Sequence, residues 1–127
     1  MIDKYGIDSH KLNHHLDRVC AWQSGKNIYP IYAEFSPSGA CNHRCVYCGL
    51  DFMRYKPLFH DAGIMSRRLA EMGRLGLKSV MFAGEGEPFL HPDMPRMANA
   101  AKAAGVDVAF TTNAVLFTPD KCDKCLK

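Results

Sequence analysis

Three cysteines lie within eight residues, at Cys41, Cys45 and Cys48, with the spacing C-x3-C-x2-C. Iron–sulfur clusters are held by cysteine thiolates, and a [4Fe–4S] cluster normally takes four of them. Three local ligands would leave one iron without a protein ligand. An open coordination position is what distinguishes a catalytic metal site from a structural one. The triplet therefore predicts a metal centre that can bind an exogenous molecule.

Two other kinds of metal site compete with this interpretation. A structural zinc site needs four ligands in recognisable pairs. His43 is poorly placed to complete a tetrahedron with its neighbours, but Cys20, Cys122 or Cys125 could supply a fourth ligand from a distance. An iron–sulfur electron carrier would also need a fourth cysteine, and it would need no cofactor pocket.

Two further polar segments follow expected strands. The strand at 78–83 runs into Gly84-Glu85-Gly86-Glu87-Pro88, and the strand at 106–110 ends in Thr111-Thr112-Asn113. Glycines at the end of a strand permit close approach of the backbone to a ligand. A plain strand-to-helix turn with Glu87 in solvent is the alternative interpretation of the first segment.

The cysteine spacing, with the aromatic Tyr47 directly before the last cysteine, resembles the signature of the radical S-adenosylmethionine (radical SAM) enzymes. The resemblance implies that Cys41, Cys45 and Cys48 bind a [4Fe–4S] cluster. It also implies that the amino and carboxylate groups of S-adenosylmethionine chelate the free iron, and that Tyr47 lies against the adenine.

The turn after the second strand resembles the Gly-Gly-Glu-Pro motif of the same family. Gly86, Glu87 and Pro88 match it, and Glu85 stands where the first glycine usually stands. The resemblance implies that this turn, with Gly84 at its start, receives the amino group of the cofactor. It further implies that Asn113 points toward the cofactor or substrate pocket.

Hydrophobic periodicity predicts alternating helices and strands. Helices are expected at 9–22, 64–75, 93 or 95 to 104, and from 118 onward; strands are expected at 28–36, 78–83 and 106–110. This alternation predicts an α/β fold with a parallel sheet and right-handed crossovers. The carboxyl ends of parallel strands share one edge of the sheet, so the cysteine loop, the glycine turn and Asn113 should meet there.

The resemblance covers residues 28–127 and implies the first half of a partial (β/α)6 TIM-like barrel. A strand-plus-helix unit takes about 30 residues, so three strands account for this chain and six would not fit. We therefore expect a truncated core domain, with residues 1–27 as an N-terminal helical extension. The isolated chain is expected to be incomplete and poorly active.

Two features stay open from the sequence alone. The apolar connection at 49–62 could cover the metal site or pack on the core. The pair Cys122 and Cys125 could bind a second cluster, form a redox pair or be ordinary helix residues. Cys20 falls on the apolar stripe of the first helix, where buried cysteine commonly behaves as a small hydrophobe.

Bulk composition limits the partners and the compartment. The net charge of +3 is too small to indicate nucleic acid or an acidic membrane. Polar sequence follows Met1 where a signal peptide would be apolar, and no stretch approaches the roughly 20 apolar residues of a membrane span. A reducing cytoplasm, with cysteines used for metal, is the expected setting.

The resemblance implies the following activity. A one-electron reductant of the flavodoxin or ferredoxin type reduces the cluster, and S-adenosylmethionine is cleaved reductively to a 5′-deoxyadenosyl radical. That radical abstracts hydrogen from a substrate, which no residue in the sequence identifies. The alternatives from other classes are an iron–sulfur electron-transfer protein and a structural zinc-binding domain.

Overall fold

A three-stranded parallel sheet forms the centre of the chain in the computed structural model, which describes residues 11–54 and 56–126. The strands are β1 (Tyr32–Phe35), β2 (Ser79–Phe82) and β3 (Asp107–Phe110), in the order β1-β2-β3. Tyr32 pairs with Ser79, and Ser79 pairs with Asp107, so the three strands start level with one another. The predicted α/β class and parallel sheet are confirmed.

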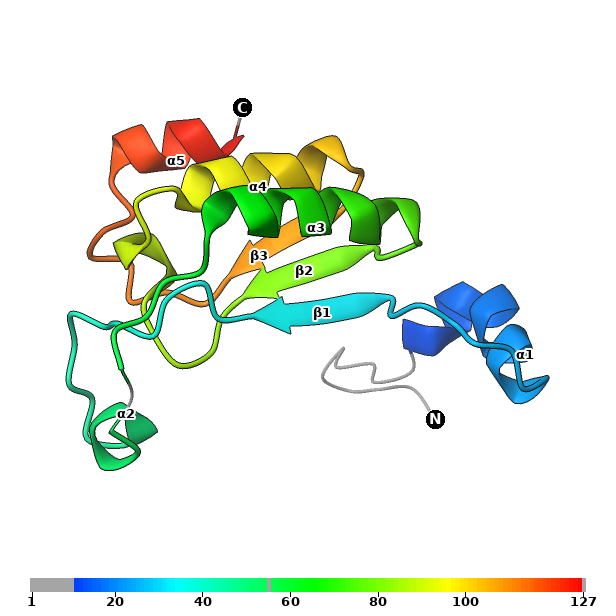
Figure 1. The fold of residues 1–127 in the computed structure, drawn as a ribbon, viewed down its shortest axis with the longest axis horizontal. Coiled ribbons are helices and arrows are strands. Elements are labelled where there is room, and N and C mark those ends of the chain that lie inside the picture. Colours follow the sequence, from blue (N-terminus) through cyan, green and yellow to red (C-terminus); the bar gives the residue numbers. More distant parts are fainter. Residues whose placement is uncertain (1–10, 55, 127) are drawn as a thin grey trace, which may run out of the picture.

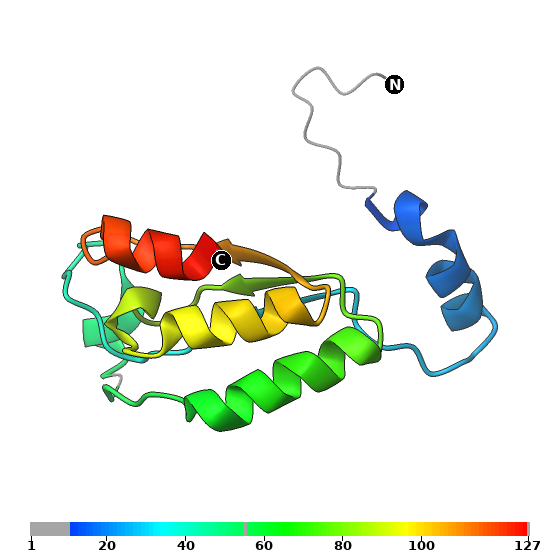
Figure 2. The ribbon, with the colours of Figure 1, turned by 90° about the horizontal axis from the view of Figure 1, so that it is seen from above.

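Helices lie between the strands in sequence, and the three longest to follow β1 cover one face of the sheet (Figures 1 and 2). They are α3 (Ala62–Arg74), α4 (Met94–Ala103) and α5 (Pro119–Leu126). The shorter elements are η1 (Lys11–His15), α1 (Leu16–Gln23), α2 (Gly49–Phe52) and η2 (Pro88–Leu90). Among the described residues, no helix combines the length and the apolar character needed to cross a bilayer.

The core lies between the sheet and these helices. Side chains alternate between the two faces of a strand, so Val80 and Phe82 of β2 both point toward the helices and are buried. Leu69 of α3 and Met97 and Ala101 of α4 have no exposed surface and meet them from the helix side. The small side chain of Ala101 lets α4 pack close to the sheet.

The opposite face of the sheet carries Tyr32, Glu34, Met81 and Ala109, none of which is buried. The Tyr32 hydroxyl donates a 2.5 Å hydrogen bond to the Glu34 carboxylate. That bond, with smaller contributions from burial and from the negative charge of Glu34, raises the pKa of Tyr32 to about 12. The face without helices is therefore partly polar.

The first strand is shorter than the predicted 28–36. It begins at Tyr32 because β2 offers only four residues, Ser79 to Phe82, as ladder partners. Pro30 lacks an N–H and cannot extend the ladder backwards. The carbonyl of Ile31 still accepts from the N–H of Lys78, which aligns the two strands at their start.

Helix α3 begins with a cap that the sequence prediction missed. The side chain of Asp61 accepts a 2.7 Å hydrogen bond from the N–H of Ile64, and the helix ends before Gly76, whose φ is +104°. The buried side of α3 is narrow. Ile64 and Leu75 are about half exposed, because only the stripe through Met65 and Leu69 faces α4 and the sheet.

The N-terminal helix lies beyond the end at which the strands begin (Figure 1). Of the predicted helix 9–22, residues 9 and 10 lie outside the described part of the chain. Leu16 is 61% exposed and Cys20 is also exposed, so the expectation that Cys20 packs as a small hydrophobe is wrong. The helix has no buried residue because it is joined to the sheet mainly through Arg18, which donates to the carbonyls of Tyr29 and Gly76.

Candidate functional site: three loops at the carboxyl edge of the sheet

The segments after β1, β2 and β3 meet at the carboxyl edge of the sheet. Residues 36–48 carry the cysteines, residues 83–88 carry the glycine turn, and residues 111–113 follow the last strand. The N–H of Ala83 donates to Phe35 and the N–H of Thr111 donates to Phe82, so the ladder continues one step beyond the strands. The parallel order therefore brings the three predicted segments together.

The three thiols of the cysteine loop differ in their exposure to solvent. Cys41 is half-buried, whereas Cys45 and Cys48 are exposed on a turn in which the N–H of Cys48 donates to the carbonyl of Cys45 over 2.9 Å. Between them, Tyr47 is 90% exposed. A hydrogen bond to the Cys45 side chain, with the negative charge of that group, raises the pKa of Tyr47. Only Cys41 is fixed against the rest of the site.

The connection 49–62 braces the base of this loop through its backbone. Ser38 and Phe59 form an antiparallel bridge, and the N–H of Gly39 donates to the carbonyl of Leu58 over 2.7 Å. Leu58 and Phe59 are 69% and 48% exposed, so their side chains do not pack into the core. The connection lies beside the segment that leads to the cysteines.

Gly86 lets the turn after β2 approach the cysteine loop closely. A Cβ atom at this position would lie 1.9 Å from the carbonyl oxygen of Ser38 and 2.6 Å from that of Ala40. The approach allows the N–H of Glu87 to donate to the carbonyl of Ala40 over 2.8 Å. Gly84, with φ +107°, similarly has room for no side chain against Ser36. The space that these two glycines leave is filled by the chain itself.

The carboxylate of Glu87 is 2% exposed and is held by three donors. Oε1 accepts from the Thr112 hydroxyl at 2.6 Å and from the N–H of Phe89 at 3.0 Å, and Oε2 accepts from the N–H of Asn113 at 2.8 Å. The alternative of a solvated turn residue is therefore wrong. Pro88, which is also buried, starts the short helix η2.

Asn113 lies between the last strand and the cysteine loop. Its Nδ2 donates to Oδ1 of Asn42 over 2.8 Å and makes a long contact of 4.0 Å with Sγ of Cys41. The structure thus places Cys41, Glu87 and Asn113 in one connected group. It leaves Cys45, Tyr47 and Cys48 on the exposed part of the loop.

Sequence reasoning missed two contributors to this group. Thr112 and Asn42 are the immediate neighbours of the predicted site residues Asn113 and Cys41, but a side chain that bonds across loops leaves no periodic signal in the sequence. His91, in the turn before α4, is 3% exposed. Its Nδ1 accepts from the N–H of Asp93, the residue before α4, and its Nε2 lies 2.7 Å from the carbonyl of His60, so it joins the start of α4 to the connection 49–62.

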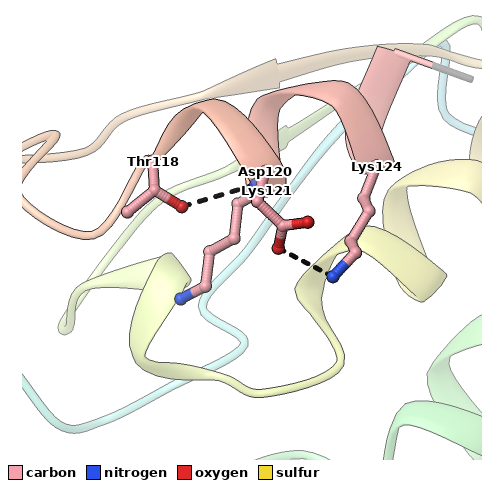
Figure 3. Close-up of polar contacts among 4 residues, drawn as sticks. All are labelled: Thr118, Asp120, Lys121 and Lys124. Atoms are coloured by element: carbon pink, nitrogen blue, oxygen red, sulfur yellow. Dashed lines mark hydrogen bonds and ion pairs between the residues drawn. The ribbon is translucent and has the colours of Figure 1, made fainter.

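Helix α5 closes the core beside the site. The Thr118 hydroxyl accepts from the N–H of Lys121, and Lys124 pairs with Asp120 at 2.7 Å (Figure 3). Lys121 also donates to the carbonyl of Phe89, which joins α5 to η2. Cys125 is buried in the core, and this burial is the main cause that raises the pKa of its thiol.

Comparison with known proteins agrees with these features. The sequence profile described as Radical SAM superfamily matches residues 35–127. A GTP 3′,8-cyclase of Chlorobaculum tepidum is 37% identical over 87 residues, which cover 67% of this chain and 26% of that protein. An Fe-coproporphyrin III synthase of Methanosarcina barkeri is 26% identical over 95% of this chain and 29% of its own length. The chain therefore spans under a third of these relatives.

Solved structures share the fold. SuiB of Streptococcus suis, in a crystal structure bound to S-adenosylmethionine, superposes on 91% of this chain and 27% of its own, with a TM-score of 0.68 and 24% identity. BtrN, in complex with AdoMet and 2-DOIA, covers 79% of this chain and 42% of its own, with a TM-score of 0.62 and 16% identity. From the profile match over most of its length and the three cysteines at the carboxyl edge of its sheet, the chain belongs to the radical SAM superfamily.

Proposed function

We propose that residues 28–127 carry the cluster- and cofactor-binding part of a radical SAM enzyme, with residues 1–27 as an N-terminal extension. The observation that carries the proposal is the cysteine triplet on the loop after β1, in a chain that matches the family over residues 35–127. The matched relatives bear different names, so no substrate is assigned to this chain.

Cys41, Cys45 and Cys48 would hold a [4Fe–4S] cluster. Their donor type suits it, since thiolates are the ligands of such clusters. In the described residues no three His, Cys, Asp or Glu side chains gather into one metal-binding arrangement, so the assignment rests on donor type and loop position. A bound cluster would supply the single electron for reductive cleavage of S-adenosylmethionine.

Glu87 would receive the ammonium group of S-adenosylmethionine. An ionised carboxylate has about four lone-pair sites, and the three donors described above leave room for about one more. Gly84, Gly86 and Pro88 would hold this carboxylate in place by fixing the turn, and Asn113 would border the same space. Tyr47, on the exposed part of the loop, would cover the adenine.

The exposed turn at Cys45–Cys48 would also face the electron donor, a one-electron reductant of the flavodoxin or ferredoxin type. Val46 and Tyr47 are 102% and 90% exposed, so their side chains are accessible to a partner protein. A turn of this kind gives a partner direct access to two of the three ligands. The setting would be a reducing one, where thiols stay available for metal.

The test is anaerobic reconstitution of the chain with iron and sulfide. We expect about four irons per chain and an electron paramagnetic resonance (EPR) spectrum that changes when S-adenosylmethionine is added. Replacing Cys41, Cys45 or Cys48 by Ala should each abolish iron uptake. Cys20→Ala is the matched control and should leave it unchanged, because Cys20 lies on α1, beyond the end at which the strands begin, whereas the cysteine loop follows their carboxyl ends.

Two outcomes would assign the chain to another class. Stoichiometric zinc in anaerobically purified protein, with no uptake of iron, would replace the proposal by a structural zinc domain. An EPR spectrum that does not change when S-adenosylmethionine is added would instead indicate an iron–sulfur electron carrier.

A further inference from the structure

The three cysteine sulfurs do not have equal surroundings. Sγ of Cys41 accepts from the N–H of His43 at 3.4 Å and from Nδ2 of Asn113 at 4.0 Å. Cys45 and Cys48 are exposed. One ligand position is therefore in contact with a neutral amide from β3's loop, 72 residues away in the sequence.

Asn113 is held in this orientation from three sides. Its Nδ2 donates to Asn42 at 2.8 Å, its Oδ1 accepts from the N–H of Val115 at 3.1 Å, and its own N–H donates to Glu87. Because Nδ2 carries two hydrogens, the bond to Asn42 leaves one for the sulfur. The side chain is thereby directed at Cys41 before anything binds.

Glu87 is the anchor of this arrangement. Its buried carboxylate accepts from both the Thr112 hydroxyl and the N–H of Asn113, so it fixes two consecutive residues of the β3 loop. Its backbone N–H donates at the same time to Ala40, the residue before Cys41. One residue thus sets the distance between the loop that carries Asn113 and the loop that carries Cys41.

We infer that Asn113 is a positioning residue for Cys41, and that it raises the reduction potential of a cluster bound there, with Thr112 and Glu87 holding it in place. The inference rests on the proposed function for its redox part. Hydrogen bonds to ligand sulfurs are one of the levers that set cluster potentials. An N–H directed at the sulfur offsets part of the thiolate's negative charge, which favours the reduced cluster.

The first test measures the midpoint potential of the reconstituted chain by EPR-monitored titration. Asn113→Ala removes both amide donors, and Asn113→Asp removes them but keeps an oxygen for the N–H of Val115. We expect both to bind iron and to shift the potential to more negative values. Asn99→Ala, which removes an amide that bonds to Lys124 on α5, is the matched control and should not shift it.

A shift in Asn113→Asp alone would show that only the added charge matters, and would overturn the inference. Thr112→Val should move the potential in the same direction by loosening Asn113, and Thr112→Ser should restore it by returning the hydroxyl. A Thr112→Val chain with the original potential would remove Thr112 from the arrangement and contradict the inference.

The second test needs no cluster. In the metal-free chain, nuclear magnetic resonance should detect slow hydrogen exchange at the backbone N–H of Asn113, and Thr112→Val should accelerate it by about tenfold or more, whereas Asn99→Ala should not. If the unsubstituted chain takes up no iron, the proposed function fails, and this measurement still decides whether Asn113 is held. Fast exchange in the unsubstituted chain would overturn the positioning role itself.

Discussion

At the scale of single residues, Glu87 would combine two tasks, the proposed contact with the cofactor and the observed support of the loops around it. The match to the family motif predicts a contact with the cofactor, and the structure adds three hydrogen bonds within the chain. A carboxylate that is 2% exposed is tolerated in the interior only when its oxygens accept hydrogen bonds. Phe89, Thr112 and Asn113 donate these bonds, so the carboxylate is fixed before a ligand arrives.

Replacing Glu87 by Gln should therefore have two separate effects. Affinity for S-adenosylmethionine should fall roughly ten- to hundred-fold, because a charge-assisted hydrogen bond is worth about 1.5–3 kcal/mol. The free energy of unfolding of the metal-free chain should also fall, by about 1–3 kcal/mol, since an amide nitrogen cannot accept a hydrogen bond. Equilibrium binding to the reconstituted chain and urea denaturation of the metal-free chain measure the two.

Glu71→Gln is the control for this substitution. Glu71 is a partly exposed carboxylate on α3, paired with Arg68, and its loss should change neither quantity noticeably. Iron content should stay the same in both variants. If Glu87→Gln behaves like Glu71→Gln in binding and in unfolding, Glu87 has neither role.

At the scale of elements, the site is a junction of loops that support one another through main-chain atoms. The turn after β2 reaches the cysteine loop at Ala40, and the connection 49–62 reaches it at Gly39 and Ser38. Both contacts lie just before Cys41, so the path of the chain into the first cysteine is fixed from two sides. From Cys45 onward the loop has exposed side chains up to Cys48.

Gly86→Ala tests this junction. The added Cβ would meet the Ser38 carbonyl at 1.9 Å, so the two loops must separate and the bond from Glu87 to Ala40 must break. We expect a loss of about 1–3 kcal/mol or more in the free energy of unfolding, together with reduced iron retention during gel filtration. Denaturant midpoints and iron analysis provide the measurement.

Gly25→Ala serves as the comparison. Gly25 has φ +76° but no atom within 4 Å of the added Cβ, so it carries backbone strain without a clash, costing about 1 kcal/mol. It should leave iron retention unchanged. Equal losses of stability in the two variants would show that the loops yield easily and that their close contact is not needed.

At the scale of the whole molecule, the sequence predicted the alternation of elements and the edge of the sheet at which the cysteine loop, the glycine turn and Asn113 meet. Both follow from local patterns: apolar periodicity, glycines after strands, and the order of parallel crossovers. The hydrogen bond from the N–H of Gly39 to the carbonyl of Leu58 could not be predicted, because backbone pairing leaves no side-chain pattern in the sequence. The contact between Thr112 and Glu87 was missed for a related reason, since polar residues 25 apart carry no shared period.

The sheet also predicts how the chain behaves in solution. Within the described residues, β3 pairs with a strand only on the β2 side, and Ala109 on its helix-free face is exposed. An unpaired strand edge is a template for pairing with another chain. We expect the 127-residue chain to associate as its concentration rises through the micromolar range, as sedimentation velocity would detect.

Ala109→Lys should shift this association toward monomers, because a lysine on an edge strand opposes pairing. The control Ala103→Lys adds the same charge on exposed α4 surface and should leave association unchanged. A chain that stays monomeric throughout the concentration series would show that the β3 edge is protected.

The close contact of Gly86 with the cysteine loop limits how this site can evolve. The atoms that exclude a side chain there are the carbonyl oxygens of Ser38 and Ala40, which every amino acid possesses. No replacement at position 38 or 40 can therefore compensate for a larger residue at position 86. A suppressor screen on Gly86→Ala should return true revertants, or changes in the length of the 36–40 segment, and no single substitution at those two positions. We therefore expect the turn at 83–88 and the segment at 36–40 to change in evolution only together.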